Sequence, residues 1–222
     1  MVVKDCDFTV QKGEIIGLMG ESGSGKSTLA KLLIGLEKPS QGEILLDGQP
    51  YSVKKFGVRI LLVFQDSLHS VNPHFTVEQV LTEALPKDVV REEIEAILED
   101  VGLDKIYLNQ PARQLSGGQL QRICIARGLL LKPDILIFDE ALSGLDPIVQ
   151  GRLLRLLYDL WEKYQLTYLF ISHDFKLSYA LCHRILVMAD GEIVDEIKDF
   201  ELPIQDHHPV TKKLIGDKGH FS

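Results

Sequence analysis

A glycine-rich segment near the start of the chain could bind phosphate. Residues 20–27 read GESGSGKS and fit the P-loop pattern G-x-x-x-x-G-K-[ST]. Its glycines let backbone N–H groups reach phosphate oxygens without interference from a Cβ atom. We expect Lys26 to bridge the β- and γ-phosphates of a nucleotide and the Ser27 hydroxyl to bind Mg²⁺. The predicted cofactor-binding residues of this segment are Gly20, Ser22, Gly23, Ser24, Gly25, Lys26, Ser27 and Thr28.

A glycine-rich turn without a ligand is the alternative interpretation of this segment. The apolar run Ile15–Met19 precedes it and predicts a buried strand, whereas Lys26–Leu33 has the composition of a helix that Gly35 ends. A strand before and a helix after is the context that a P-loop requires. The positive end of that helix would also face the phosphates. The context therefore favours a nucleotide site.

Two adjacent carboxylates follow another apolar run. Ile135–Phe138 predicts a buried strand, and Asp139 and Glu140 come directly after it. The carboxyl ends of strands are where the ligands of open α/β folds collect. We expect Asp139 to hold Mg²⁺, directly or through water, and Glu140 to polarise the attacking water. One acid at a strand end is common, but a pair downstream of a P-loop indicates hydrolysis.

A third segment, Leu115–Gln119, reads LSGGQ and lies just ahead of the predicted helix Gln119–Leu131. Ser116 and the backbone N–H groups of Gly117 and Gly118 would make a second phosphate site at a helix N-terminus. One chain does not need two such sites for one phosphate chain. The segment is the signature sequence of ATP-binding-cassette (ABC) ATPases, and the chain therefore resembles that family.

Other markers of the ABC family occur in family order, and the resemblance extends from Gly13 to about Glu196. Gln65 resembles the Q-loop glutamine. Residues 143–146, which read SGLD, resemble the D-loop, and His173 resembles the switch histidine. The order and spacing of these motifs over almost the whole chain identify it as a member of the family.

The resemblance implies a head-to-tail dimer that binds ATP and Mg²⁺. Each ATP would lie between the P-loop of one subunit and the signature of the other. Asp146 would couple the two sites, His173 would contact the γ-phosphate and the catalytic water region, and Gln65 would sense Mg²⁺ and the nucleotide state. The implied catalytic residues are Glu140, His173, Lys26 and Gln65; the metal site is Ser27, Gln65 and Asp139; the signature and D-loop residues at ATP are Ser116, Gly117, Gly118, Gln119 and Asp146.

The resemblance also implies a role in transport. The chain resembles importers, whose ATPase and integral-membrane permease subunits are commonly separate polypeptides, with a substrate-binding protein as an indirect partner. It would then lie at the cytoplasmic side of the cell membrane as a peripheral subunit. Residues 66–73 and 208–214 are similar to segments of the peptide/nickel importer branch, which takes up peptides, nickel and metal chelates. The partner ATPase could be an identical chain or a paralogue.

Two other functions compete with import. Soluble ABC ATPases act in translation or DNA repair, but these typically have tandem cassettes or long coiled coils. A module that only binds ATP would be favoured if Glu140, His173 or Lys26 were missing, and all three are present.

The sequence departs from the family pattern at the adenine. Family members usually stack the adenine on an aromatic residue well upstream of the P-loop, and that position would fall before Met1. Phe8 is too close to Gly20 and lies in a predicted strand. We therefore expect weaker ATP binding than in a relative with that aromatic, by about 1–3 kcal/mol for one lost base stack.

Apolar strands alternate with helices along most of the chain, which implies a parallel sheet covered on both faces. The resemblance implies an α/β fold: a P-loop NTPase (RecA-like) core with a mostly parallel sheet, a small antiparallel β subdomain and an inserted α-helical subdomain. We expect a single ABC ATPase domain over residues 1–222. Residues 1–65 and 132–222 would form the nucleotide-binding core, and residues 66–131 the helical subdomain that carries the signature.

Some local features are predicted without a functional role. Thr76–Leu85 and Val90–Val101 should be helices, the second capped by Asp88 and ended by Gly102. The segment from Leu202 onward should be a surface tail. Six histidines without a nameable partner should be structural or exposed: His69, His74, His183, His207, His208 and His220.

Composition bounds the function classes. The 222 residues suffice for one domain with a substantial core. A net charge of −8 and a pI near 5.4 argue against a nucleic-acid partner. Three scattered cysteines favour a reduced cytosolic compartment. The N-terminus has acids where a signal peptide is apolar, and no apolar run is long enough to cross a bilayer. Work at a membrane would need a partner.

Overall fold

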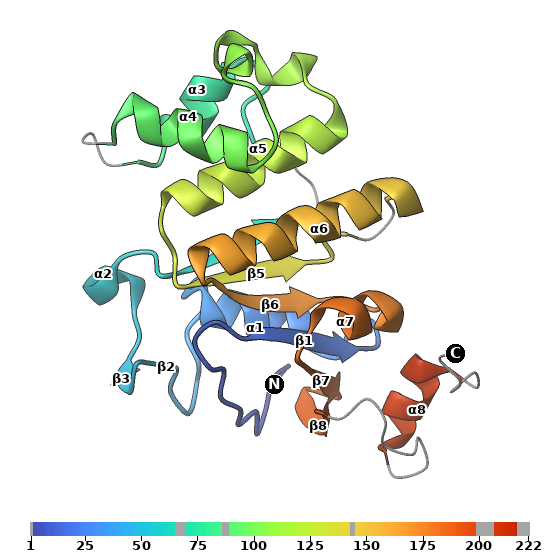
Figure 1. Cartoon of the computed structure of the whole chain (residues 1–222). Helices are drawn as coiled ribbons and strands as arrows, with labels where there is room; N and C mark the ends of the chain where they lie inside the picture. The colour runs from blue at the N-terminus through green and yellow to red at the C-terminus, as the bar shows by residue number, and fades with distance from the viewer. Residues whose placement is uncertain (1, 65–69, 86–88, 143–144, 199–206, 217–222) are drawn as a thin grey trace.

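A computed structural model describes residues 2–64, 70–85, 89–142, 145–198 and 207–216 (Figure 1). A six-stranded sheet forms the centre, with helices on both faces and a separate group of helices beyond one edge. The first half of the chain contains β1 (Ile15–Gly20), α1 (Lys26–Leu33), β2 (Leu45–Leu46), β3 (Gln49–Pro50), α2 (Val53–Phe56), β4 (Ile60–Phe64), α3 (Val77–Thr82) and α4 (Arg91–Asp100). The second half contains the 3₁₀ helices η1 (Lys105–Asn109) and η2 (Ala112–Gln114), then α5 (Gly117–Leu130), β5 (Ile135–Asp139), α6 (Pro147–Tyr164), β6 (Thr167–Ile171), α7 (Phe175–Leu181), β7 (Arg184–Ala189), β8 (Glu192–Ile197) and α8 (Pro209–Ile215).

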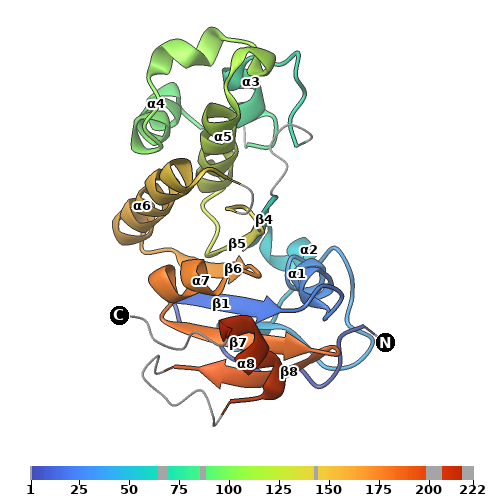
Figure 2. The same cartoon turned by 90° about the vertical axis from the view of Figure 1, so that its right-hand side faces the viewer.

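The central sheet has the strand order β4-β5-β6-β1-β7-β8. All neighbouring pairs are parallel except β7 and β8, which form an antiparallel hairpin. Helix α1 covers one face, and α6 and α7 cover the other (Figures 1 and 2). The predicted parallel sheet with helices on both faces is therefore confirmed. Strands β2 and β3 pair in a separate small antiparallel sheet. Phe8 does not lie in a strand.

The alternation of side chains along β1 shows why an unbroken apolar run was needed. Ile15 and Met19 join the apolar cluster under α6 and the helical group, whereas Ile16 and Leu18 join the cluster under α1, with Leu29. Both faces of the strand are buried. Since each face packs against a helix, the run is apolar at nearly every position.

Helices α3, α4 and α5 pack together beyond the β4 edge of the sheet (Figure 2). One continuous apolar cluster runs from Val80 and Leu98 in this group, through Ile123 of α5, to Phe138 of β5. Helix α3 begins at Val77 and is shorter than predicted. Helix α4 begins at Arg91 with Val90 at its N-cap position, and Asp88, the predicted cap, lies outside the described residues. Among the described residues, no helix has the length and apolar composition needed to span a membrane.

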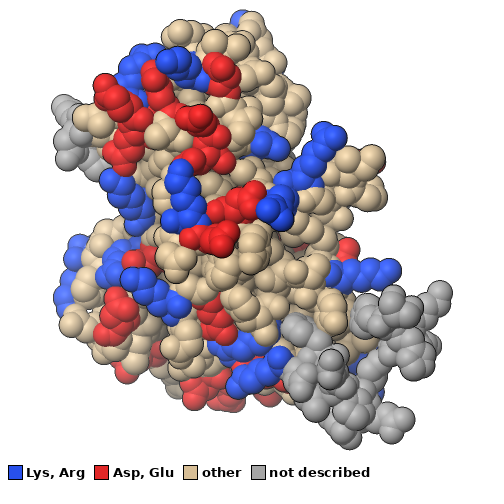
Figure 3. Space-filling model, in the orientation of Figure 1, with Lys and Arg blue, Asp and Glu red and all other residues tan. Residues whose placement is uncertain are grey.

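The junction between α4 and α6 is polar. Asp100, the last residue of α4, accepts hydrogen bonds at 2.5 and 2.7 Å from the Lys163 ammonium of α6 and a further one from the Tyr164 hydroxyl. On the face shown in Figure 3, acidic and basic side chains gather at this level, between the helical group and α6. Helices α3, α4 and α5 therefore contact the sheet and α6 through ion pairs at the surface and through apolar packing inside.

The prediction that the C-terminal segment is a surface tail is wrong for residues 207–216. They form α8, which packs against β1 and β7. The Asp195 carboxylate of β8 accepts hydrogen bonds from His207 Nδ1 at 3.1 Å, His208 N at 2.9 Å and Thr211 Oγ1 at 2.8 Å. Thr211 is fully buried and His207 is 9% exposed. The sequence did not reveal this docking because the acceptor is on another element.

Partners also exist for two other histidines that lacked one in the sequence. His183 Nδ1 accepts a hydrogen bond from the Ile15 N–H at 2.9 Å, and the His74 ring lies 3.4 Å from the Arg113 guanidinium. His69 and His220 lie outside the described residues.

The docking of α8 predicts an acid-sensitive contact. Burial raises the pKa of Asp195, but the hydrogen bonds from His208 and Thr211 outweigh it and hold that pKa below its ordinary value. A carboxylate with a lowered folded-state pKa stabilises the fold fully above its unfolded-state pKa, near 3.9, and this stabilisation is lost as the pH falls below that value.

Replacing Asp195 with asparagine should therefore lower the free energy of unfolding by about 1–3 kcal/mol at pH 7 and reduce its decline below pH 4. Urea unfolding at several pH values measures both effects. Asp159→Asn, at an exposed carboxylate of α6, is the matched control. An Asp195→Asn chain that keeps the parent's stability and acid response would contradict this interpretation.

Candidate nucleotide-binding and hydrolysis site

The P-loop joins the end of β1 to the start of α1, as the sequence predicts. A Cβ atom on Gly20 would lie 2.2 Å from the Met188 carbonyl oxygen of β7, so only glycine lets the chain pass there. Gly25 precedes α1 with φ of 110°, a backbone conformation that residues with a Cβ atom rarely adopt. These two glycines are thus required by the loop's own path, which turns the N-terminus of α1 towards the carboxyl edge of the sheet.

The Lys26 side chain folds back over this loop. Its ammonium group donates hydrogen bonds of 2.8 Å to the carbonyl oxygens of Gly20 and Glu21. Burial lowers the pKa of Lys26, while Glu140 and Asp139 oppose that shift. A cation held at this place, beside backbone N–H groups and a helix N-terminus, is suited to bind a polyphosphate.

Asp139 ends β5 beside Ile171, the last residue of β6. Burial raises the pKa of Asp139, and a hydrogen bond with the Ser27 side chain opposes the shift. A hydroxyl and a carboxylate that touch at the edge of a phosphate cradle are the oxygen donors that Mg²⁺ prefers. Among the described residues, no three His, Cys, Asp or Glu side chains group as a metal site. This donor set fits an ion that keeps water and phosphate ligands.

Glu140 follows Asp139 in a left-handed backbone conformation, with φ of 52°. Its N–H donates to the Ile171 carbonyl at 2.9 Å, which turns the chain away from the strand direction. Its carboxylate Oε1 lies 2.9 Å from Nδ1 of His173, which is largely exposed. The structure therefore brings the predicted base and the predicted switch histidine into contact.

An open cleft of about 400 Å³ connects these groups. It is lined by predicted site residues from the P-loop, the end of β5 and the segment after β6, and by Val2, which no sequence pattern indicated. Ser24 does not line the cleft, because its side chain is buried. The lining residues are Val2, Gly20, Ser22, Gly23, Gly25, Lys26, Ser27, Thr28, Asp139, Glu140 and His173. The arrangement can hold a nucleotide's phosphates next to a carboxylate base.

The signature residues lie elsewhere, at the N-terminus of α5. Ser116 Oγ accepts from Gln119 N at 3.3 Å, and Gln119 Oε1 accepts from Ser116 N at 2.9 Å, which closes a capping box. Gln119 Nε2 also donates to the Tyr107 hydroxyl at 2.9 Å. None of the four predicted signature residues lines the cleft of its own chain in the part that the structure describes.

The predicted D-loop residue Asp146 also lies apart from the cleft lining. Asp146 caps α6 by accepting a hydrogen bond from Ile148 N at 2.9 Å, and it is exposed. Gln65 lies outside the described residues.

Comparisons with known proteins agree with this geometry. The family model described as "ABC transporter" matches residues 3–143. The nickel import ATP-binding protein NikE of Shigella sonnei (strain Ss046) is 42% identical over 100% of this chain and 81% of its own length. The metal-staphylopine import system ATP-binding protein CntF of Staphylococcus aureus (strain NCTC 8325 / PS 47) is 39% identical over 96% and 88%.

Solved structures show the same fold. The chain is similar to cbiO1 from Clostridium perfringens, part of the ABC transporter complex cbiONQ, with a TM-score of 0.79 and 29% identity, covering 89% of this chain and 82% of that one. The ATP-binding cassette MJ0796, a dimer bound to ADP and Pi, has a TM-score of 0.73 and 27% identity, covering 89% and 91%. Family model, relatives and fold thus confirm what the motifs predicted: the chain belongs to the ABC transporter family and is one of its ATP-binding, ATP-hydrolysing subunits.

Proposed function

We propose that this chain powers an importer for peptides, nickel or metal chelates. Two relatives that match over most of their length are named for nickel import and metal-staphylopine import, which supports this branch. The chain would work as a peripheral subunit at the cytoplasmic side of the membrane, through integral-membrane permease subunits and, indirectly, a substrate-binding protein. Translation and repair ATPases have no counterpart among these relatives.

In this proposal a head-to-tail dimer completes the ATP site. Two exposed glycines are the observation that supports it. Gly117 and Gly118 begin α5 without left-handed backbone angles, and a Cβ atom on either would meet nothing within 4 Å. Unlike Gly20, they are not required by the path of their own chain. Glycine in a helix costs about 0.5–1 kcal/mol relative to alanine. A ligand from outside the chain, approaching the bare N-terminus of α5, accounts for that cost.

Each part of the chain has a separate task in the proposal. Residues 1–65 and 132–222 form the nucleotide-binding core, and residues 66–131 form the helical subdomain that presents the signature to the partner's ATP. Asp146, exposed at the start of α6, would couple the two sites, and Gln65 would report the state of nucleotide and metal to the permease.

The cleft residues have distinct roles in hydrolysis. Lys26 and the P-loop N–H groups hold the β- and γ-phosphates. Ser27 and Asp139 would hold Mg²⁺, which when bound neutralises charge that develops on the phosphate oxygens. Glu140 Oε1 accepts a hydrogen bond from the attacking water and takes up its proton. His173, already in contact with that oxygen, orients the carboxylate towards the γ-phosphate.

Uptake by the native cell tests the transport proposal. Cells in which the chromosomal copy carries Glu140→Gln should lose uptake of at least one of radiolabelled Ni²⁺, chelated Ni²⁺ or a dipeptide. The chain should also copurify from solubilised membranes with an integral-membrane protein that has several transmembrane segments. Cells carrying Glu162→Gln, at an exposed carboxylate of α6, are the matched control. Unchanged uptake of all three substrates, together with a chain recovered only from the cytosol, would exclude the importer.

A further inference from the structure

The two residues after Glu140 are held by side chains from two different helices. Gln121 of α5 donates a hydrogen bond from Nε2 to the Ala141 carbonyl at 2.7 Å. Gln150 of α6 donates from Nε2 to the next carbonyl, that of Leu142, at 3.1 Å. Ala141 and Leu142 are both buried, and Gln121 is only 7% exposed. Successive carbonyls of one short segment therefore each have their own amide donor.

Glu140 needs such support because its backbone is in a strained conformation. With φ of 52°, it lies in the left-handed region, where a residue with a side chain persists only if its surroundings hold it. The bond from its N–H to Ile171 holds the N-terminal side. The two glutamine bonds hold the C-terminal side. Together these bonds fix the direction in which the Glu140 side chain leaves the backbone.

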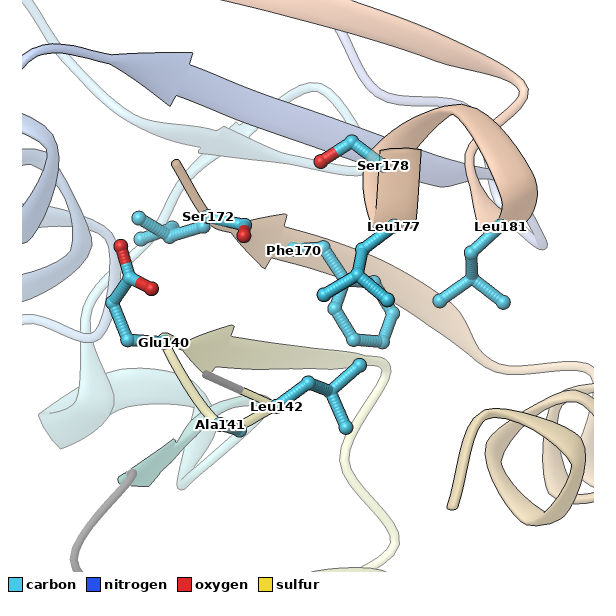
Figure 4. A pocket seen from close by; sticks show the side chains of 9 residues that line it. Glu140, Ala141, Leu142, Phe170, Ser172, Leu177, Ser178 and Leu181 are labelled. Carbon is cyan, nitrogen blue, oxygen red and sulfur yellow. The ribbon is translucent and has the colours of Figure 1, made fainter. Parts of the chain in front are cut away.

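The segment also packs against α7. On the side of α7 it borders a small cavity of about 10 Å³, lined by Phe170, Leu177, Leu181 and the segment itself (Figure 4). Figure 4 shows Glu140 at one end of this pocket and the Leu142 side chain facing the leucines of α7. Packing against α7 holds the segment without fixing the direction of its carbonyls, and the bonds from Gln121 and Gln150 supply that direction.

We infer that Gln121 and Gln150 are positioning residues for ATP hydrolysis, acting through the backbone of Ala141 and Leu142 on the Glu140 carboxylate. The inference rests on the proposed role of Glu140 as the base. Gln121 lies on α5 a little over one turn beyond Ser116, so a displacement of the signature helix is transmitted directly to the segment that orients Glu140. Within one chain, the orientation of the helical subdomain therefore affects the orientation of the Glu140 carboxylate.

The test replaces each glutamine by methionine, which has a similar length and no donor. Purified full-length Gln121→Met should show a kcat for ATP hydrolysis reduced about ten- to hundredfold, with KM and ATP affinity little changed, because the base is misplaced and the phosphate cradle is intact. Gln150→Met should show a smaller loss, since its bond is longer and its side chain less buried. Gln165→Met, which removes a similar amide bond to the Glu162 carbonyl at the end of α6, should keep the parent kcat.

A double-mutant cycle separates positioning from simple stabilisation. The rate of a single turnover is measured with excess enzyme, per molecule of ATP bound, for Gln121→Met alone, Glu140→Gln alone and both together. If Gln121 acts through Glu140, Gln121→Met slows the parent chain but not the Glu140→Gln chain. Equal slowing in both backgrounds, or a parent-like kcat for both Gln121→Met and Gln150→Met, overturns the inference while leaving the base assignment intact. A Glu140→Gln chain as fast as the parent removes the proposed base itself, and the inference with it.

Discussion

Glu140→Gln is expected to lower kcat for ATP hydrolysis by about 10²- to 10⁴-fold while ATP binding persists. The amide cannot take a proton from the attacking water, but it keeps the size of the side chain and can still contact His173. Steady-state hydrolysis and equilibrium binding of ATP, measured on the same preparation, separate the two effects.

The control for Glu140→Gln is Glu162→Gln, which makes the same chemical change at an exposed position of α6. It should hydrolyse ATP at the parent rate. A Glu140→Gln chain with kcat within a few-fold of the parent would exclude Glu140 as the base.

Lys26→Gln should weaken ATP binding by about a hundredfold. The Lys26 ammonium donates to two P-loop carbonyls and lines the cleft in which we expect the phosphates to bind. Loss of its charge-assisted hydrogen bonds corresponds to about 1.5–3 kcal/mol, and each 1.4 kcal/mol changes affinity tenfold. Titration of the chain with ATP, followed by calorimetry, measures the change.

Lys213→Gln is the matched control at the same loop. Lys213 of α8 pairs with the Glu21 carboxylate at 2.5 Å, but both side chains are largely exposed, so the pair contributes little. We expect nearly unchanged ATP affinity for this variant. Equal losses in both variants would mean that the net charge near the loop, rather than the position of Lys26, determines binding.

Features encoded in a short stretch of sequence were predictable. The P-loop glycines, the strand before them and the helix after them form one local unit, and the helix bounds Lys26–Leu33 agree with the prediction. Strand β5 and its acidic end were also predictable, because an apolar run followed by Asp139 and Glu140 fits few structures other than a buried strand that ends at a site. The structure adds that Ser27 and Asp139 are in contact, which follows once β1 and β5 lie in one parallel sheet.

Features that depend on distant pairing were not predictable. Asp195 docks His207, His208 and Thr211 from another element, and nothing in the local sequence of α8 indicates that acceptor. The same holds for the Gln121 bond to Ala141, which joins α5 to the segment after β5.

One missed feature did have a local signal. Ser116 and Gln119 follow the S-x-x-Q spacing of a capping box, and the same spacing recurs at Thr76 and Gln79, where α3 begins. The spacing at Thr76 indicates the first residue of α3 directly. At Ser116 it shows that the signature serine also holds the start of its own helix.

Gly118→Ala tests most directly the claim that a second subunit completes the ATP site. Alanine fits the monomer without a clash and suits a helix better, so the free energy of unfolding should stay the same or rise by about 0.5–1 kcal/mol. ATP hydrolysis, measured where the parent's activity per molecule no longer rises with protein concentration, should fall at least about tenfold, because the added methyl group keeps the partner's ATP from the helix N-terminus. Gly151→Ala, at an exposed position in the second turn of α6, should bring the same gain in stability and keep the parent activity. A Gly118→Ala chain that hydrolyses ATP at the parent rate would contradict the composite site.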